Sequence, residues 1–355
     1  MIGTLKHKGL IWCVILSSFL VSCISEDKKE AKKEKWHEVT GETQGTTYKI
    51  ALDDIDRKIS KKAIDSILCN FDLSLSTYID NSVVSVINAS QDPIHVLDSS
   101  RYFAKCYIMS RKIYELTNGA FDPSVYPLVK AWGFYGDELW VQSDADVSEI
   151  LKSVGFEDRK HHELNPINLF ELEFLKFNQN FKLDFNAIAQ GLSVDVLADY
   201  LEEHGIKNYF VEIGGEIRVK GKNTKNGLWR IGVDSPNQEE GMRVIENIVH
   251  ISDKAVATSG NYRKFYVKDG VKYAHTINPK TGKPVQHSLL SATVIANNCA
   301  EADAYATAFM VMGVEKSMQF ITEHPELGLE IYLLHDEGNG KLQRSMSPGF
   351  KTYLK

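Results

Sequence analysis

Apolar positions in the first third of the chain recur at spacings that predict one strand and two helices. Residues 45–50 are typical of an opening strand. A first helix is expected to end near residues 76–78, and its apolar face consists of Ile64, Ile67, Leu68, Phe71 and Leu75. Asp98 and Ser99 can cap a second helix, which Asn118-Gly119 is expected to stop.

The rest of the chain is richer in strands. Residues 181–185 alternate like a strand and run directly into a helix that begins at Asn186 and ends near Gly205. Residues 209–219 predict a hairpin turning on Gly214-Gly215, although these glycines can equally allow a ligand to approach the backbone. Further strands are expected at residues 228–233, 244–251, 265–268, 291–296 and 329–334, with a turn at 257–262. The pattern therefore predicts an α+β fold with largely antiparallel sheets and packed helices.

The N-terminus has the pattern of an exported protein. Lys6 and Lys8 precede an apolar run from Leu10 to Val21, which is too short for an ordinary transmembrane helix. The run ends in Leu20-Val21-Ser22-Cys23, which is similar to a bacterial lipobox. We therefore expect residues 1–22 to be a lipoprotein signal peptide and Cys23 to carry the lipid. A plain secretory leader is the alternative.

The residues after the apolar run predict a tether. Residues 23–36 are mostly charged, with both signs mixed, so they are expected to be flexible and to leave residues 37–355 as the folded domain. Lipid on Cys23 would hold that domain at the cell membrane, on its extracytoplasmic side. The formal net charge of -6 and the absence of a basic stripe argue against nucleic acid as a partner.

The cysteine count and the absence of several short motifs exclude several classes of site. Of the five cysteines, only Cys69, Cys106 and Cys299 belong to the expected domain, so a full disulfide framework is excluded. A Cys69–Cys106 bridge stays open but is not favoured, because both lie in expected amphipathic helices. The chain has no Cys-x-x-Cys, no His-Glu-x-x-His, no Rossmann glycine motif and no Walker lysine loop.

Asp303 and Thr307 form a candidate metal site. Positions four apart on a helix share one face, so the two residues present a carboxylate and a hydroxyl together. Hard oxygen ligands of this kind suit magnesium. The alternative is ordinary helix chemistry, in which the acid complements the helix dipole and the threonine bonds back to a carbonyl. His275, in the loop at 273–279, is either a proton acceptor or a histidine satisfied within its loop.

A set of short motifs between Gly45 and Gly313 resembles the ApbE family. Each motif alone is weak, but their order along the chain is highly specific. They are Gly45-Thr46-Thr47-Tyr48, Ser76-Thr77-Tyr78, Gly119-Ala120-Phe121-Asp122-Pro123, Leu183 to Gly191, Ile213-Gly214-Gly215-Glu216, Ala257-Thr258-Ser259-Gly260, His275 to Gly282, and Ala302 to Thr307. The resemblance implies two lobes around an FAD cleft. It also implies magnesium-dependent transfer of FMN from FAD to a threonine of a partner flavoprotein, with release of AMP.

The resemblance further implies roles for individual residues. Asp303, Thr307 and the main-chain carbonyl of Ala187 match magnesium ligands, and His275 matches the catalytic base. The positions that match the FAD site are Gln44, Tyr78, Ala120, Phe121, Asp122, Asp184, Gln190, Thr258 and Ile277. The expected acceptors are subunits of membrane redox complexes.

Three positions depart from the usual family pattern. Lysine is frequent at the position of Gln190, aspartate at that of Asn278 and methionine at that of Gln44. These departures leave two alternatives open: an FAD pyrophosphatase, and a non-catalytic FAD-binding lipoprotein.

Overall fold

The computed structural model describes residues 36–354, apart from 136–140, 142, 158, 237–243, 262–264, 269–270, 337 and 339–340. The expected signal peptide, Cys23 and nearly all of the expected tether therefore lie outside the described residues. Residues 35–355 form one compact unit, so the two expected lobes are parts of a single folded body. Among the described residues, no helix has the length and hydrophobicity needed to cross a membrane.

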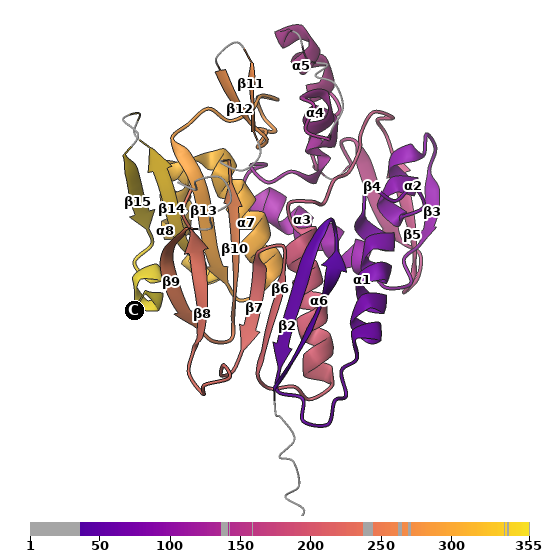
Figure 1. Ribbon diagram of the computed structural model, residues 1–355. Coiled ribbons are helices and arrows are strands. Elements are labelled where there is room, and N and C mark those ends of the chain that lie inside the picture. The colour runs from indigo at the N-terminus through magenta and orange to yellow at the C-terminus, as the bar shows by residue number, and fades with distance from the viewer. Residues whose placement is uncertain are drawn as a thin grey trace, which may run out of the picture. The chain divides into compact units, whose positions relative to one another are not determined.

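An antiparallel sheet of eight strands forms the centre of the fold (Figure 1). Its order is β1 (His37–Thr43), β2 (Thr46–Leu52), β6 (Tyr209–Ile213), β7 (Glu216–Lys220), β10 (Lys254–Gly260), β13 (Leu289–Ala296), β14 (Glu330–Asp336) and β15 (Leu342–Met346). All seven neighbouring pairs are antiparallel. The predicted α+β class with largely antiparallel sheets is confirmed.

The alternating side chains of the sheet build a different core on each face. On one face, Ala255 and Ala257 pack with residues of helices α6 (Ala189–Glu203) and α7 (Cys299–Met312). On the other face, Val256 packs with β8 (Trp229–Asp234) and β9 (Ile245–Ile251), which pair with each other as a separate ribbon. The sheet therefore lies between a helical layer and a two-stranded layer.

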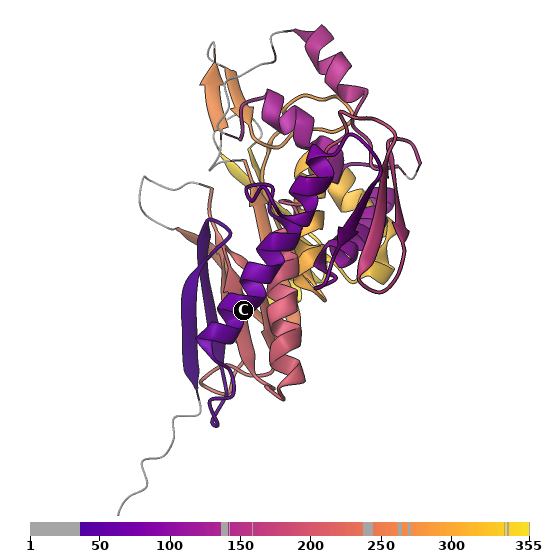
Figure 2. The ribbon, with the colours of Figure 1, turned by 90° about the vertical axis from the view of Figure 1, so that its right-hand side faces the viewer.

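The remaining elements surround these layers (Figure 2). They are helices α1 (Lys61–Leu75), α2 (Val83–Ala89), α3 (Tyr102–Leu116), α4 (Tyr126–Ala131), α5 (Asp144–Leu151) and α8 (Val314–Glu323), 3-10 turns η1 (Pro123–Val125), η2 (Pro325–Leu327) and η3 (Phe350–Tyr353), the three-stranded sheet of β3 (Ile94–Leu97), β5 (Glu171–Lys176) and β4 (His162–Pro166), and the ribbon of β11 (Phe265–Lys268) and β12 (Val271–Ala274). Cys69, Cys106 and Cys299 are free thiols.

Two predicted elements are wrong. Residues 181–185 form no strand, because the side chain of Asn88 bonds both the amide and the carbonyl of Leu183 (2.7 and 2.8 Å), and the amide of Asp184 donates to Pro123 (2.7 Å). The following helix accordingly begins at Ala189, later than expected. Residues 257–260 belong to β10 rather than to a turn, because they pair with β13.

Candidate active site

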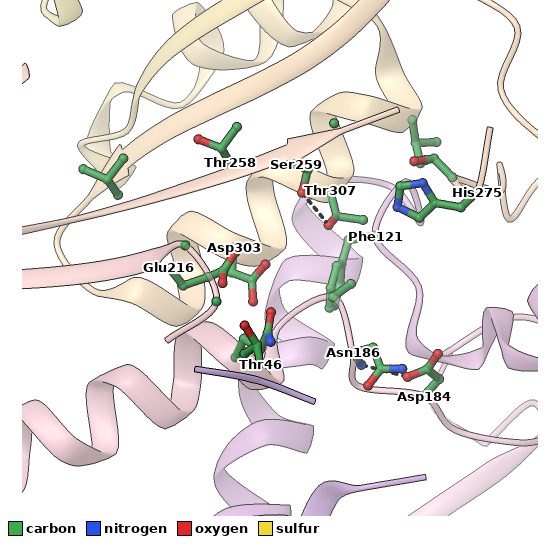
Figure 3. A pocket seen from close by; sticks show the side chains of 18 of the residues that line it. Thr46, Phe121, Asp184, Asn186, Glu216, Thr258, Ser259, His275, Asp303 and Thr307 are labelled. Carbon is green, nitrogen blue, oxygen red and sulfur yellow. Dashed lines mark hydrogen bonds between the residues drawn. The ribbon is translucent and has the colours of Figure 1, made fainter. Parts of the chain in front are cut away.

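A cavity of about 1200 Å³ lies where the helical layer meets the strand ends (Figure 3). Its lining comes from segments that run from Thr46 to Val311. It contains all but one of the residues predicted to bind FAD or metal or to act as base: Tyr78, Ala120, Phe121, Asp122, Asp184, Ala187, Gln190, Thr258, His275, Ile277, Asp303 and Thr307. The fold therefore brings together residues that are spread over most of the chain.

Asp303 lies on α7 with its carboxylate buried against α6. Its Oδ2 accepts a hydrogen bond from the amide of Gly191 (3.0 Å), and burial raises the pKa of this carboxyl group to about 7. A Cβ at Gly191 would lie 2.3 Å from the carbonyl oxygen of Cys299. Glycine thus allows the two helices to touch where Asp303 meets the cavity.

Thr307 follows Asp303 by one turn and also lines the cavity. Its Oγ1 lies 3.1 Å from Oγ of Ser259 on β10 (Figure 3). Ala187 lines the same cavity just before α6 begins. Among the described residues, no group of three or more His, Cys, Asp or Glu side chains could hold a metal ion.

These residues nevertheless fit magnesium. Magnesium in proteins commonly takes only one or two carboxylates and completes its shell with water and substrate phosphates. Asp303 supplies one such carboxylate, and its raised pKa means that a nearby cation would favour the ionised form. Thr307 and the backbone at Ala187 offer neutral oxygens beside the same cavity.

Asp195 holds the start of α7, a role that the sequence did not reveal. Its two carboxylate oxygens accept the amides of Cys299 and Ala300, each at 2.9 Å, and Oδ1 also pairs with Arg218 at 2.9 Å. A carboxylate satisfies the unpaired amides at a helix N-terminus and complements its dipole. Since Asp195 and Gly191 are both on α6, that helix holds both the start of α7 and the Asp303 carboxylate.

The opposite wall combines an acid with tyrosines. Asp184 accepts hydrogen bonds from the amide of Asn186 (2.7 Å) and from the hydroxyl of Tyr135, and burial raises its pKa. Tyr78 is 73% exposed and its ring lies 5.7 Å from that of Tyr135. Tyr135 was missed by sequence reasoning, because nothing local to residues 132–135 points to Asp184.

The segment from Ala120 to Asp122 is rigidly held. The amide of Phe121 donates a hydrogen bond to Thr117 Oγ1 (3.2 Å). Asp122 caps the following 3-10 turn by accepting the amide and hydroxyl of Ser124 (2.7 and 2.6 Å). Burial raises the pKa of Asp122 to about 6. The Phe121 ring therefore meets the cavity from a fixed backbone.

His275 follows β12 and lies half-buried at another edge of the cavity. Its ring is 6.4 Å from that of Phe134. The neighbouring Thr276 donates to Asn261 Oδ1 at 2.6 Å, and Ile277 forms a bridge with Pro284. These contacts fix the loop that carries His275.

Three residues predicted to contact FAD differ in their position relative to the cavity. Gln44 is outside the cavity lining, in the β1–β2 turn, where its Oε1 accepts from Ser193 Oγ at 3.4 Å. Thr258 lines the cavity, but its hydroxyl lies 2.9 Å from that of Thr293 on β13. Gln190 lines the cavity beside Gly214, where an added Cβ would come within 2.9 Å of the Gln190 amide nitrogen.

Sequence reasoning assigned no site residue to the side of the cavity that strands β2, β6, β7 and β8 provide. The residues concerned are Lys49, Phe210, Glu212, Glu216, Ile217, Arg230, Ile231, Gly232 and Asp234. Alternation predicted these strands, but it carries no signal for which of them borders a cavity. Figure 3 places Glu216 near Asp303, so a second acid borders the candidate metal site.

The fold and the cavity together define an α+β protein with one large site containing an acid, hydroxyls and a histidine. The ApbE family model matches residues 44–332, and the chain belongs to the ApbE family. The FAD:protein FMN transferase of Vibrio cholerae serotype O1 is 35% identical over 352 residues, which cover 97% of this chain and 98% of that protein. The FAD:protein FMN transferase of Escherichia coli strain K12 is 33% identical over 345 residues, which cover 95% and 94%.

Solved structures agree with this assignment. The flavin transferase ApbE from Vibrio cholerae has a TM-score of 0.75 at 32% identity, covering 90% of this chain and 99% of that chain. The apo form of the Pseudomonas stutzeri flavinyl transferase ApbE has a TM-score of 0.76 at 29% identity, covering 90% and 96%. The architecture described here is thus that of the ApbE flavin transferases.

Proposed function

We propose that this chain is a magnesium-dependent transferase that moves FMN from FAD to a threonine hydroxyl of another protein and releases AMP. The observation that carries the proposal is the single cavity that gathers Asp303, Thr307 and His275. The relatives are FAD:protein FMN transferases, which supports the reaction class.

In this reaction the threonine Oγ attacks the phosphorus of the FMN half of FAD. A new phosphoester bond forms, the phosphoanhydride bond to AMP breaks, and AMP leaves with the bridging oxygen. The attacking hydroxyl must lose a proton, and His275 is the group we assign to accept it, since a neutral imidazole accepts protons near pH 7. No oxidant or reductant is needed.

The acids and hydroxyls of the cavity would act on the phosphates through a bound magnesium ion. Asp303, Thr307 and the carbonyl of Ala187 would hold magnesium, which supplies neutralisation of the charge that develops on the phosphate oxygens. Gln190 faces the cavity where relatives often have lysine, so one positive charge is absent. Tyr78 and Phe121 would stack against flavin or adenine, a contact worth about 0.5–1.5 kcal/mol beyond area burial.

We further propose that the enzyme is a lipoprotein that works on the extracytoplasmic side of the cell membrane. Cys23 would carry the lipid, residues 23–36 would form the tether, and subunits of membrane redox complexes would be the acceptors. Support comes from the sequence alone: the lipobox-like residues 20–23 follow an apolar run.

One assay tests the reaction. The full chain is incubated with FAD, magnesium and a threonine-containing acceptor, and acceptor mass and AMP are followed. We expect the acceptor to gain one FMN as AMP appears. AMP and free FMN without labelling would instead support a pyrophosphatase, and no turnover would support a binding protein.

Asp303→Ala should abolish this turnover, because the variant loses the only carboxylate assigned to magnesium. The matched control is Glu301→Gln, which changes an acid on the same helix whose Oε2 bonds Asn298 (2.8 Å) rather than facing the cavity. Retained magnesium-dependent activity in Asp303→Ala would refute the metal assignment.

A further inference from the structure

One edge of strand β8 borders the cavity. Arg230, Ile231 and Gly232 all line the cavity, and Asp234 does so as well. Successive side chains of a strand point to opposite faces, so three consecutive residues border one space only where the backbone edge faces it. Ile231 packs into the core beneath β8, whereas Arg230 is exposed. The cavity therefore reaches the main chain of β8.

Within the described part of the chain, this edge has no strand beside it. β8 pairs with β9 along its whole length, from Trp229 opposite Ile251 to Asp234 opposite Ile245, and with no other strand among the described residues. An edge without a neighbouring strand presents amides and carbonyls that can pair with another chain. Such an edge is a ready template for an extended peptide.

The strands below the edge complete a groove. Phe210 and Glu212 on β6 and Lys49 on β2 line the same cavity, and Lys49 and Glu212 are directly paired in the sheet. Phe210 offers a half-buried aromatic surface. Gly215, at the β6–β7 turn, has no atom within 4 Å of an added Cβ, so the backbone there is open. These residues and Asp303 line one and the same cavity.

The cavity is larger than a typical small-molecule site. Its volume of about 1200 Å³ exceeds the usual range for small-molecule sites, about 300–1,000 Å³. The residues assigned to FAD and magnesium are all outside β2, β6, β7 and β8. FAD bound by those residues leaves the β8 groove for a second substrate.

We propose that the acceptor polypeptide docks in extended form along the free edge of β8, as an added strand that leads its threonine toward Asp303 and His275. This inference rests on the proposed function. Arg230 is exposed and lines the cavity at this edge, so the docked segment carries an acidic side chain opposite it.

Synthetic unstructured peptides, each with one threonine and one acidic residue at varied spacing, test this docking. They are incubated with the full chain, FAD and magnesium, and FMN labelling is read by mass. For a labelled peptide, only every second backbone amide should bond to the β8 edge. We expect N-methylation of those amides to lower the labelling rate about tenfold. N-methylation of the amides between them should leave the rate unchanged. Losses without this two-residue period overturn the proposal.

A variant pair supplies the second measurement. Arg230→Glu should raise the KM for the labelled peptide about tenfold while the KM for FAD stays unchanged, because like charges then meet in the groove. Lys225→Glu, which reverses an exposed charge away from the cavity, is the control and should change neither. Equal effects of the two variants would overturn the proposal.

Failure of docking and failure of the reaction give different results. If a folded acceptor protein gains FMN but no peptide does, docking along β8 is wrong, because an extended segment should suffice. AMP and free FMN with no acceptor labelled at all contradict the proposed transfer instead. If FAD is left intact with every acceptor, the proposed transfer itself is wrong, and the docking proposal fails with it.

Discussion

At the scale of single residues, burial sets the chemistry of the cavity. Asp303 and Asp122 are both removed from water, and burial raises their pKa values to about 7 and about 6. A carboxylate in such surroundings favours a nearby positive charge. The acidic side of the cavity is therefore suited to a cation held together with an anionic substrate.

His275→Ala should keep FAD binding and lose transfer by about 10²–10⁴-fold, the usual contribution of a general base. FAD affinity can be followed by flavin fluorescence and transfer by acceptor mass. His204→Ala is the control, because His204 is exposed at the end of α6 and bonds Tyr200. Transfer at the wild-type rate in His275→Ala would remove this histidine from the mechanism.

His162 predicts acid sensitivity of the fold. It is fully buried, neither ring nitrogen has a hydrogen-bond partner among the described residues, and its ring stacks on Phe181 (4.4 Å) and Phe156 (4.8 Å). Burial, with smaller effects of His161 and Arg111, lowers its pKa from 6.5 to about 3. As the pH falls, His162 is therefore protonated in the unfolded chain before it is protonated in the folded chain. Stability is lost as pH falls below 6.5, by about 1.4 kcal/mol per pH unit.

Replacement of His162 should remove this loss of stability at low pH. Between pH 7 and pH 5, the unfolding free energy of His162→Phe should fall by about 2 kcal/mol less than that of the wild type. Urea unfolding at the two pH values measures the difference, with exposed His204→Gln as the control. An unchanged pH dependence in His162→Phe would show that His162 is not the sensitive group.

At the scale of elements, the contact between α6 and α7 positions the candidate metal site. Asp195→Asn removes the charge that holds the first amides of α7 and pairs with Arg218. We expect the magnesium concentration for half-maximal transfer to rise about tenfold, as for other residues that orient a metal ligand. Saturating magnesium should restore most of the rate.

The titration with magnesium separates this role from plain stabilisation. A residue that only stabilised the fold would lower the melting temperature without changing the magnesium requirement. Gly191→Ala should act in the same direction, because its Cβ would meet Cys299 and Asp303. Gly227→Ala is its control, since an added Cβ there meets only Asn223 at 3.7 Å.

Elements set by local spacing were predictable from the sequence. The face shared by Asp303 and Thr307 and the hairpin at Gly214-Gly215 depend on neighbours within a few residues, and both agree with the structure. Contacts between distant segments were not predictable. Residues 257–260 carry small and hydroxyl side chains typical of a turn, and only pairing with β13 makes them a strand.

The site follows the same division. The motifs identified most of the cavity residues. Tyr135 and Asp195 were not identified, because each is distant in sequence from the residue that it holds. The unpaired edge of β8 could not be predicted either, because the alternation of a strand does not indicate which of its two edges is paired.

At the scale of the whole molecule, the expected lipid anchor determines where the enzyme works. Cys23→Ser should move the full chain from the membrane fraction to the soluble fraction, because two or more acyl chains are what give stable attachment. Fractionation and immunoblotting measure the change. Cys69→Ser, which alters a free thiol in the folded domain, should stay at the membrane. Retention of Cys23→Ser there would contradict the lipid assignment.

The cavity takes its lining from Thr46 near one end of the domain and from Val311 near the other. A ribosome must therefore release almost the entire polypeptide before any flavin pocket exists. An exported chain that is still being threaded through a membrane cannot capture the dinucleotide. The exported lipoprotein that we propose would therefore have to meet its FAD after translocation, in the compartment where it matures.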